Sequence, residues 1–284
     1  MNTRSAAFAG SWYPGSKKAC EREIRAFLDE EPHPDLAGRH LVGGIVPHAG
    51  WYFSGSIACA VIHGLSLSDP PDVVALFGMH LHPGSPFYLM TEGAWETPFG
   101  ELPVASDLAG ALAERFRFTI EGKARFTPDN TIELQLPFVK YFFKNVRVVT
   151  IGAPPAGKTP AMARTLVSLA REMGLSLKVI GSTDLTHYGM NYGFTPKGAG
   201  PAALSWVTGE NDRRFIEAVL AMDPEAVIRE GTAHQNACCA GAAASAVAAA
   251  KALGAVRAEA IAYATSHDKH PAESFVGYVG IVFE

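Results

Sequence analysis

The chain has 284 residues with a formal net charge of −4; 48% of the residues are hydrophobic and 18% are charged. This balance is typical of a globular protein with a sizeable core and excludes a disordered chain. The sequence contains no basic block, which argues against a nucleic-acid partner and against binding to an anionic membrane surface. It has no apolar run suited to a signal peptide or a membrane span, and only four cysteines, so we expect a cytoplasmic protein with reduced thiols.

Six apolar or β-branched runs predict strands, and their lack of polar alternation suits strands covered on both faces. In chain order they are residues 41–46, 73–78, 146–153, 177–183, 260–266 and 276–284. Helical patterns lie around them at 16–30, 55–66, 106–117, 131–144, 158–173, 211–229 and 235–253. This alternation predicts an α/β protein, a single domain of residues 1–284 in which helices flank a central parallel or mixed sheet. The Pro- and Gly-rich segment 194–203 is predicted to be a long surface loop.

Histidines gather directly after the predicted strands, where ligands of open α/β sheets usually bind. Six of the ten histidines lie there: His48, His80, His82, His187, His267 and His270. A single strand-end histidine is more often a buried residue whose ring nitrogens bond to the backbone. The clustering therefore favours a ligand site at this edge of the sheet.

Two cysteines, Cys238 and Cys239, stand near the start of the predicted helix 235–253, where the helix dipole favours a thiolate. His48 and His80 together with one such thiolate would form a three-ligand metal site with open coordination positions. Imidazole and thiolate donors suit iron, zinc or copper and disfavour magnesium or calcium.

The segment "STDLTHYG", residues 182–189, places Asp184 three residues before His187. If this turn is helical, the two side chains share a face, and a carboxylate that orients an imidazole is typical of a general base or of support for a metal ligand. The alternative is that Ser182, Thr183 or Asp184 simply caps a short helix.

Two further segments have a structural and a functional interpretation. In "DNTIELQLPF", residues 129–138, Asn130 is one of three candidate helix caps and Glu133 lies in the first turn, with a role near the site as the alternative. In "AGSWYP", residues 9–14, Trp12 either packs the N-terminal segment under the core or forms a wall of the pocket. No G-x-S-x-G elbow, P-loop or G-x-G-x-x-G motif is present, so a serine hydrolase and nucleotide binding have little support.

The order of these motifs resembles the Memo family, in particular the members called AmmeMemoRadiSam system protein B. The resemblance rests on "AGSWYP", "PHAGWYFSG", the histidine after the second strand, "IELQLPF", "STDLTHYG", a late cysteine and "VGYVGI", and it spans residues 8 to 283. It implies a fold similar to the class III extradiol ring-cleavage dioxygenases of the LigB type, with a metal pocket at one edge of the sheet.

Carried over residue by residue, the resemblance implies that His48, His80 and Cys238 are the metal ligands and that Asp184 and His187 form the nearby acid and base pair. His82 remains a rival for His80. Asn130 stands where a histidine is common in the family, and Cys239 replaces a glycine.

The function implied is that of a non-haem iron oxidoreductase. Fe(II) is the expected ion, with copper or zinc as alternatives, and His187 would move a proton of a chelating small-molecule substrate. One alternative is a metal-binding or redox accessory protein that works with partners of a radical-SAM pathway. Another is a peptide-binding module with Trp12 and Trp51 as its contact surface. His267 is a further candidate for the pocket.

Overall fold

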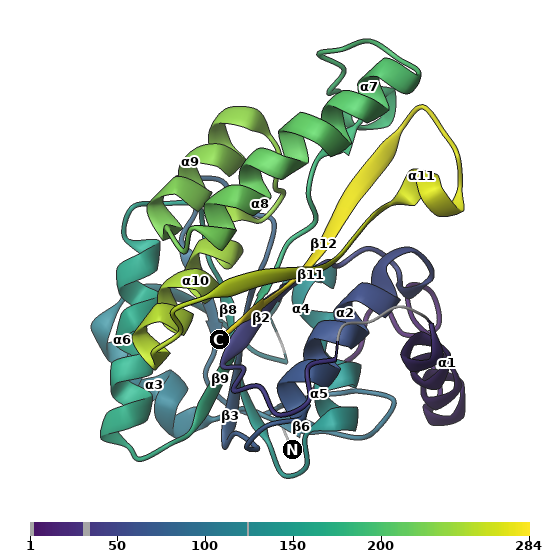
Figure 1. The fold of residues 1–284 in the computed structure, drawn as a ribbon. Coiled ribbons are helices and arrows are strands. Elements are labelled where there is room, and N and C mark those ends of the chain that lie inside the picture. The colour runs from purple at the N-terminus through teal and green to yellow at the C-terminus, as the bar shows by residue number, and fades with distance from the viewer. Residues whose placement is uncertain (1–2, 31–34, 124) are drawn as a thin grey trace.

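A mixed nine-stranded sheet lies at the centre of the computed structural model, which describes residues 3–30, 35–123 and 125–284 (Figure 1). The strands follow the order β10-β12-β2-β9-β3-β8-β4-β7, and β11 pairs with β12. The four inner strands are parallel: β2 (Gly43–Val46), β9 (Leu177–Ser182), β3 (Val73–Gly78) and β8 (Arg147–Gly152). Their side chains are almost all buried, as expected for apolar strands with helices on both faces.

The margins of the sheet contain antiparallel strands. The long strand β12 (Phe275–Phe283) runs antiparallel to β2 and to β11 (Ala258–Thr265). All six predicted strands are thus confirmed, but the expectation that residues 260–266 are covered on both faces is wrong. Strand β11 pairs only with β12 among the described strands, and most of its side chains are half-buried or exposed because it forms an edge of the sheet.

Short strands escaped the sequence analysis, because two to four residues are too few for a periodic pattern. In the large sheet they are β4 (Phe87–Met90), β7 (Phe118–Glu121) and β10 (His187–Tyr188). A separate small sheet contains β1 (Thr3–Arg4), β5 (Ala94–Trp95) and β6 (Leu102–Pro103).

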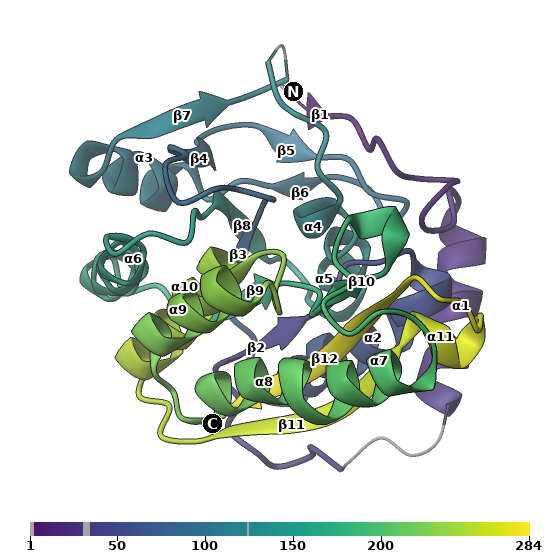
Figure 2. The same ribbon diagram turned by 90° about the horizontal axis from the view of Figure 1, so that it is seen from above.

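Helices cover both faces of the large sheet, as Figure 2 shows from above. One layer contains α3 (Ser106–Arg115), α6 (Thr159–Glu172), α8 (Asp212–Leu220), α9 (Pro224–His234) and α10 (Ala240–Leu253). The other contains α1 (Lys17–Asp29), α2 (Trp51–Ser66), α4 (Asn130–Glu133) and α5 (Leu136–Phe142). Shorter helices are α7 (Pro201–Trp206), at the end of the predicted loop, and α11 (Ser266–Lys269). Within the described part of the chain, no helix combines the length and apolar character needed to cross a membrane.

Two predicted helices are each split in two. The pattern 131–144 corresponds to α4 and α5, and the pattern 211–229 corresponds to α8 and the first part of α9, which runs on to His234. Asp223 accepts a hydrogen bond from the Ala226 amide and Pro224 occupies the first turn, so a new helix begins there. The dipeptide Asp223-Pro224 signals a helix start in the sequence, but the apolar pattern continues on both sides of it and predicts one unbroken helix.

Helix α10 starts at Ala240, five residues later than predicted, and this shift matters for the site. Gln235 adopts a left-handed conformation with φ 49° and ends α9. Cys238 therefore lies in the short connection between the two helices, and Cys239 is the N-cap residue of α10. The small side chains of α10 let it lie close to β9, where a Cβ added to Gly181 would come within 2.8 Å of Ala246 Cβ.

Candidate metal centre

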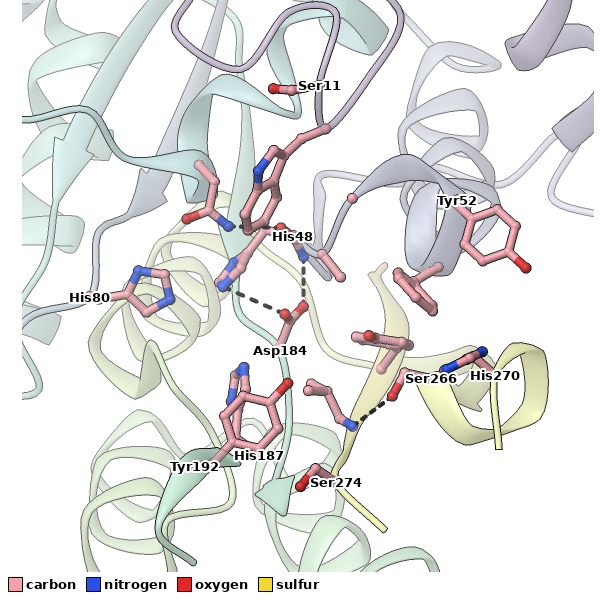
Figure 3. Close-up of a pocket in the computed structure, with 17 residues that line it drawn as sticks. Ser11, His48, Tyr52, His80, Asp184, His187, Tyr192, Ser266, His270 and Ser274 are labelled. Atoms are coloured by element: carbon pink, nitrogen blue, oxygen red, sulfur yellow. Dashed lines mark hydrogen bonds and ion pairs between the residues drawn. The ribbon is translucent and has the colours of Figure 1, made fainter. Parts of the chain in front are cut away.

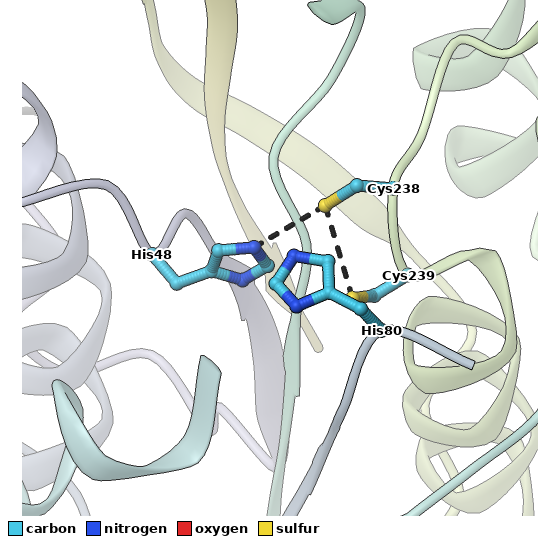
Figure 4. A group of neighbouring side chains, drawn as sticks. All are labelled: His48, His80, Cys238 and Cys239. Atoms are coloured by element: carbon cyan, nitrogen blue, oxygen red, sulfur yellow. Dashed lines mark hydrogen bonds between the residues drawn. The ribbon is translucent and has the colours of Figure 1, made fainter. Parts of the chain in front are cut away.

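The carboxyl ends of neighbouring parallel strands meet at one edge of the sheet and bring three segments together. Strand β2 is followed by His48, β3 by His80 and β9 by Asp184, while the connection before α10 adds Cys238. One candidate ligand atom from each of His48, His80, Cys238 and Cys239 lies within 4.8 Å of the other three (Figure 4). Two imidazoles and two thiols suit iron, zinc or copper, so the donor set fits the kind of metal that the sequence predicts.

His48 is buried and held at three points. Its backbone N–H donates to Asp184 Oδ1 at 2.7 Å, and its Nδ1 lies 3.0 Å from Ser182 Oγ. The Ser182 hydroxyl proton is directed to the Thr131 carbonyl at 2.7 Å, so its oxygen is left to accept from Nδ1–H. Burial lowers the pKa of His48, but Asp184 and Cys238 outweigh burial and raise it, so in the metal-free protein Nε2–H can donate to Cys238 Sγ, which lies 3.2 Å away. In the neutral tautomer that Ser182 favours, Nε2 carries the lone pair that a metal ligand needs.

His80 reaches the cluster through an unusual backbone turn. Met79 has φ 71°, and its N–H donates to Thr131 Oγ1 at 2.7 Å. Beyond this turn, His80 Nδ1 lies 3.4 Å from Asp129 Oδ2, which leaves Nε2 for the cluster. Partial burial lowers the pKa of His80, but the interactions with Asp129 and Cys238 outweigh burial and raise it to about 10.

Cys238 lies among hydrogen-bond donors that favour its thiolate. The Asp184 N–H donates to its Sγ at 3.3 Å, and His48 Nε2 and Cys239 Sγ lie at 3.2 and 3.8 Å. Burial raises the pKa of Cys238, but the Cys239 thiol and the two imidazoles act against burial and hold it well below the ordinary value. A thiolate is the form of cysteine that binds metals.

Asp184 connects the cluster to a cavity of about 560 Å³. Burial raises the pKa of Asp184, while the nearby His48 lowers it and offsets part of this effect. Its Oδ2 lies 3.8 Å from His48 Nε2. Figure 3 shows Asp184 between His48 on one side and His187 and Tyr192 on the other.

The cavity has a mixed polar and aromatic lining. His48, His80 and Asp184 line the part nearest the cluster. The walls are formed by Ser11, Trp12, Ala49, Gly50, Tyr52, Phe53, Asn130, His187, Tyr192, Ser266, His270, Ser274, Val276 and Tyr278. A pocket lined by aromatic side chains with a few convergent polar groups is the usual form of a small-molecule site.

Comparisons with known proteins show the family of this chain. A family model described as a Memo-like protein matches residues 4–282. The chain belongs to the Memo-like family. MEMO1 family proteins of Pyrococcus furiosus and Methanopyrus kandleri are 31% and 32% identical to it, over 98% and 99% of this chain and 98% of each relative.

The fold recurs in a crystal structure of an uncharacterized protein, JW3007, from Escherichia coli K12. The TM-score is 0.52 at 12% identity, covering 78% of this chain and 91% of that one. At this identity the likeness shows a shared fold alone.

Within this Memo-like chain, the two rival histidines occupy different places. The His82 side chain is exposed, and its backbone N–H donates to Ser85 Oγ. His80 is the one whose ring faces His48, with the ring centroids 5.0 Å apart. The structure therefore brings His80, and not His82, into the cluster.

Asp184 and His187 do not share a helical face, because the helical turn considered for residues 182–189 does not form. Residues 183–186 are irregular, and His187 opens β10, which pairs with β12. His187 lines the cavity with its ring 5.0 Å from that of Tyr192. The two residues thus reach the same cavity through a loop and a strand.

Three candidate pocket residues lie elsewhere. Trp51 is 1% exposed and stacks on Phe138 at 4.1 Å, so it belongs to the core rather than to a contact surface. The buried carboxylate of Glu133 binds the N-terminal segment, as described below. His267 Nδ1 bonds within its own loop, to Ala272. None of the three lines the cavity.

Trp12 and Asn130, which each have a structural and a functional interpretation from the sequence, do line the cavity. Trp12 forms part of its wall and is 42% exposed. Asn130 Nδ2 donates to the His48 carbonyl at 2.9 Å, so it supports the His48 backbone from the α4 side.

Several residues of the site could not be identified from the sequence. Ser182, the partner of His48, is predicted only as a possible helix cap, and Asp129, the partner of His80, is another of the three cap candidates at residues 129–131. Tyr192 and Tyr278 carry no local signal, since each reaches the cavity through strand pairing or a loop. The sequence signal that could have identified Asp129 and Ser182 is their position: each adjoins a segment that ends at the edge of the sheet where the histidines lie.

Proposed function

We propose that the protein binds one transition-metal ion through His48, His80 and Cys238 and acts on a small planar molecule held in the adjoining cavity. The observation that carries this proposal is the approach of His48 Nε2 to Cys238 Sγ at 3.2 Å, with the opposite ring nitrogen already bonded to Ser182. A buried imidazole fixed in this way is prepared to donate a lone pair.

The chemistry best supported is that of a metal-dependent oxidoreductase of the non-haem iron type, related to the extradiol dioxygenases through the family resemblance. A bound Fe(II) ion would supply Lewis-acid and redox chemistry to a chelating ligand. Copper and zinc also suit the donors. All four cysteines are free thiols, which fits the reducing cytoplasm that we expect for the protein.

The protein's own residues would bind the substrate and move its protons. Trp12 and Tyr192 offer aromatic faces to a planar ring. His187 stands on the cavity wall near Asp184, where an imidazole can accept a proton from a substrate hydroxyl group. Asp184 accepts a hydrogen bond from the His48 backbone. When Asp184 is ionised, its negative charge lies close to the imidazoles of His48 and His187.

Metal analysis of protein purified without added metal tests the site. We expect about one equivalent of iron, copper or zinc, and loss of this metal in His48→Ala and Cys238→Ala. His82→Ala is the matched control, because His82 is an exposed histidine two residues from His80. Retention of metal in the first two variants would refute the proposed ligand set.

Oxygen uptake with a panel of catechols tests the activity. Metal-dependent uptake that is lost in His187→Ala supports the oxidoreductase. Absence of uptake across the panel, with metal bound, favours a second function: a metal-binding accessory protein that works with radical-SAM pathway partners. The second thiol beside Cys238 favours this alternative, because soft donors hold and transfer thiophilic metals well.

A further inference from the structure

Cys239 extends the candidate metal centre beyond the three ligands proposed above. Its Sγ lies 3.8 Å from Cys238 Sγ, on the side of the cluster that faces away from the His48 ring (Figure 4). We propose that Cys239 is a second thiolate ligand, so that His48, His80, Cys238 and Cys239 enclose a thiophilic ion in a closed tetrahedral site. This inference rests on the proposed three-ligand metal site.

The separation of the two sulfur atoms matches a tetrahedral ion. With metal–sulfur bonds of about 2.3 Å and tetrahedral angles, two thiolates on one zinc ion stand about 3.8 Å apart. Adjacent octahedral positions would bring them to about 3.3 Å for the same bond length. The separation in the structure is 3.8 Å. The thiols therefore already stand at the spacing that a four-coordinate ion requires.

The imidazole of His48 lies close to the first of the two sulfur atoms. His48 Nε2 is 3.2 Å from Cys238 Sγ, against about 3.6 Å expected between a nitrogen and a sulfur ligand of one tetrahedral zinc ion. Ligand atoms of all four residues lie within 4.8 Å of one another. A bound ion would draw these four donors together from separations of at most 4.8 Å.

The backbone holds Cys239 in this position. Its N–H donates to Thr183 Oγ1 at 3.0 Å, and its carbonyl accepts from the N–H groups of Ala242 and Ala243 in the first turn of α10. The side chain is 2% exposed. Among the described residues, the polar partner of its thiol is Cys238. The backbone is thus held in place, and the buried thiol lies toward the cluster.

In the metal-free protein the two sulfur atoms share a hydrogen bond, and a disulfide is a further competing explanation for their proximity. Disulfide sulfurs are about 2.05 Å apart, and a bridge between neighbouring residues is strained. The Cys238 sulfur also accepts the Asp184 N–H and faces His48, and a bridge would pull it away from both. A shared metal ion uses the existing arrangement without this movement.

Four protein ligands have a consequence for the chemistry. A tetrahedral ion with His₂Cys₂ ligation has no open position, and sites of this kind hold zinc structurally rather than catalytically. In this protein the second thiol thus favours Zn²⁺ or Cu⁺. With four protein ligands in place, a molecule in the cavity can bind the ion only as a fifth ligand or after Cys239 has dissociated.

Cobalt substitution tests the proposal, because the thiolate-to-Co²⁺ charge-transfer band grows with the number of bound thiolates. Metal-free protein loaded anaerobically with Co²⁺ should show tetrahedral visible bands and a charge-transfer band that falls to about half in Cys239→Ser. Zn²⁺ affinity, measured by competition with a chromophoric chelator, should fall in this variant by more than the roughly 10- to 100-fold that loss of an outer-shell partner costs. Cys59→Ser is the matched control, since Cys59 is a buried thiol in α2 away from the cluster.

X-ray absorption of the zinc-loaded wild-type protein supports the test without any variant. Two sulfur neighbours at about 2.3 Å are expected. One sulfur neighbour, or an unchanged cobalt band and zinc affinity in Cys239→Ser, would overturn the role of Cys239 and leave the three-ligand site in place. A wild-type protein that takes up neither ion would overturn both proposals.

Discussion

The Nδ1 atom of His48 lies 3.0 Å from the hydroxyl oxygen of Ser182, and this hydroxyl donates onward to the Thr131 carbonyl at 2.7 Å. The relay fixes which ring nitrogen carries the proton. It also joins three elements, since His48 follows β2, Ser182 ends β9 and Thr131 lies in α4. The orientation of the His48 ring therefore depends on a residue outside the cluster of four candidate ligands.

Ser182→Ala should weaken metal binding while leaving the fold intact. Without the acceptor, His48 can place its proton on Nε2 and its ring loses an orienting bond, so we expect an affinity loss of about 10- to 100-fold. Competition with a chromophoric chelator measures it. The control is Ser245→Ala, which removes another buried hydroxyl bonded to a carbonyl, that of Gly241 within α10. Equal affinities in the two variants would contradict the relay.

Asp212 should make stability depend on pH in a defined window. This buried carboxyl accepts from the N–H and hydroxyl of Thr186 and from the Tyr263 hydroxyl. Burial raises its pKa from 3.8 to about 6, with the hydrogen bonds acting against burial. Because the folded pKa is the higher one, the contribution of the protonated carboxyl is full below about pH 3.8 and is lost as the pH rises through 6.

The measurement is urea unfolding of the wild type and of Asp212→Asn between pH 4 and pH 7. Relative to the variant, the free energy of unfolding of the wild type should fall by about 2 kcal/mol over this range, which covers most of a shift of roughly two pKa units. Other titrating groups are common to both proteins and cancel in the difference. Parallel pH profiles would show that Asp212 ionises as freely in the folded state as in the unfolded chain.

Much of the fold could be predicted because its long elements carry strong local patterns. The inner strand β3, for example, is a six-residue apolar run, and α6 matches its predicted bounds to within one residue at each end. What local patterns cannot reveal is pairing. Strand β10 has two residues and exists only because His187 lies opposite Val276 of β12.

The proximity of His48, His80 and Cys238 could be predicted from the sequence, but the residues that hold them in place could not. Strand ends converge in a parallel sheet, which favours the approach of the two histidines, and the resemblance supplied Cys238. The bond between Ser182 and His48 depends on the register of β9 against β2, in which Val46 stands opposite Ser182. Trp51 was misjudged because an aromatic residue next to a strand-end histidine looks like a pocket wall, whereas its place in the first turn of α2 turns it toward Phe138.

Gly181→Ala should destabilise the layer that carries both cysteines. An added Cβ would lie 2.8 Å from Ala246 Cβ and 2.9 Å from the Ala242 carbonyl, so α10 must move away from β9. We expect a loss of about 1–3 kcal/mol. The control is Gly110→Ala in α3, where an added Cβ meets nothing within 4 Å, and where alanine should instead stabilise the helix by about 0.5–1 kcal/mol. Thermal unfolding measures both, and shifts of the same sign would contradict the close-packing argument.

Glu133→Ala should release the N-terminal segment and with it one wall of the cavity. The buried carboxylate accepts from the N–H groups of Ala7 and Phe8 at 3.0 and 2.7 Å and from the Tyr13 hydroxyl at 3.1 Å. Removing it leaves three donors without their acceptor, at about 1–3 kcal/mol for each donor that stays buried. Limited proteolysis should therefore cut the segment before Lys17 many times faster than in the wild type.

The control is Glu133→Gln, which keeps one acceptor oxygen and should give an intermediate rate of cleavage. Trp12 lies within the segment, so its fluorescence response to a cavity ligand should be lost in parallel with the cleavage. Wild-type cleavage in the alanine variant would mean that other contacts hold the segment in place.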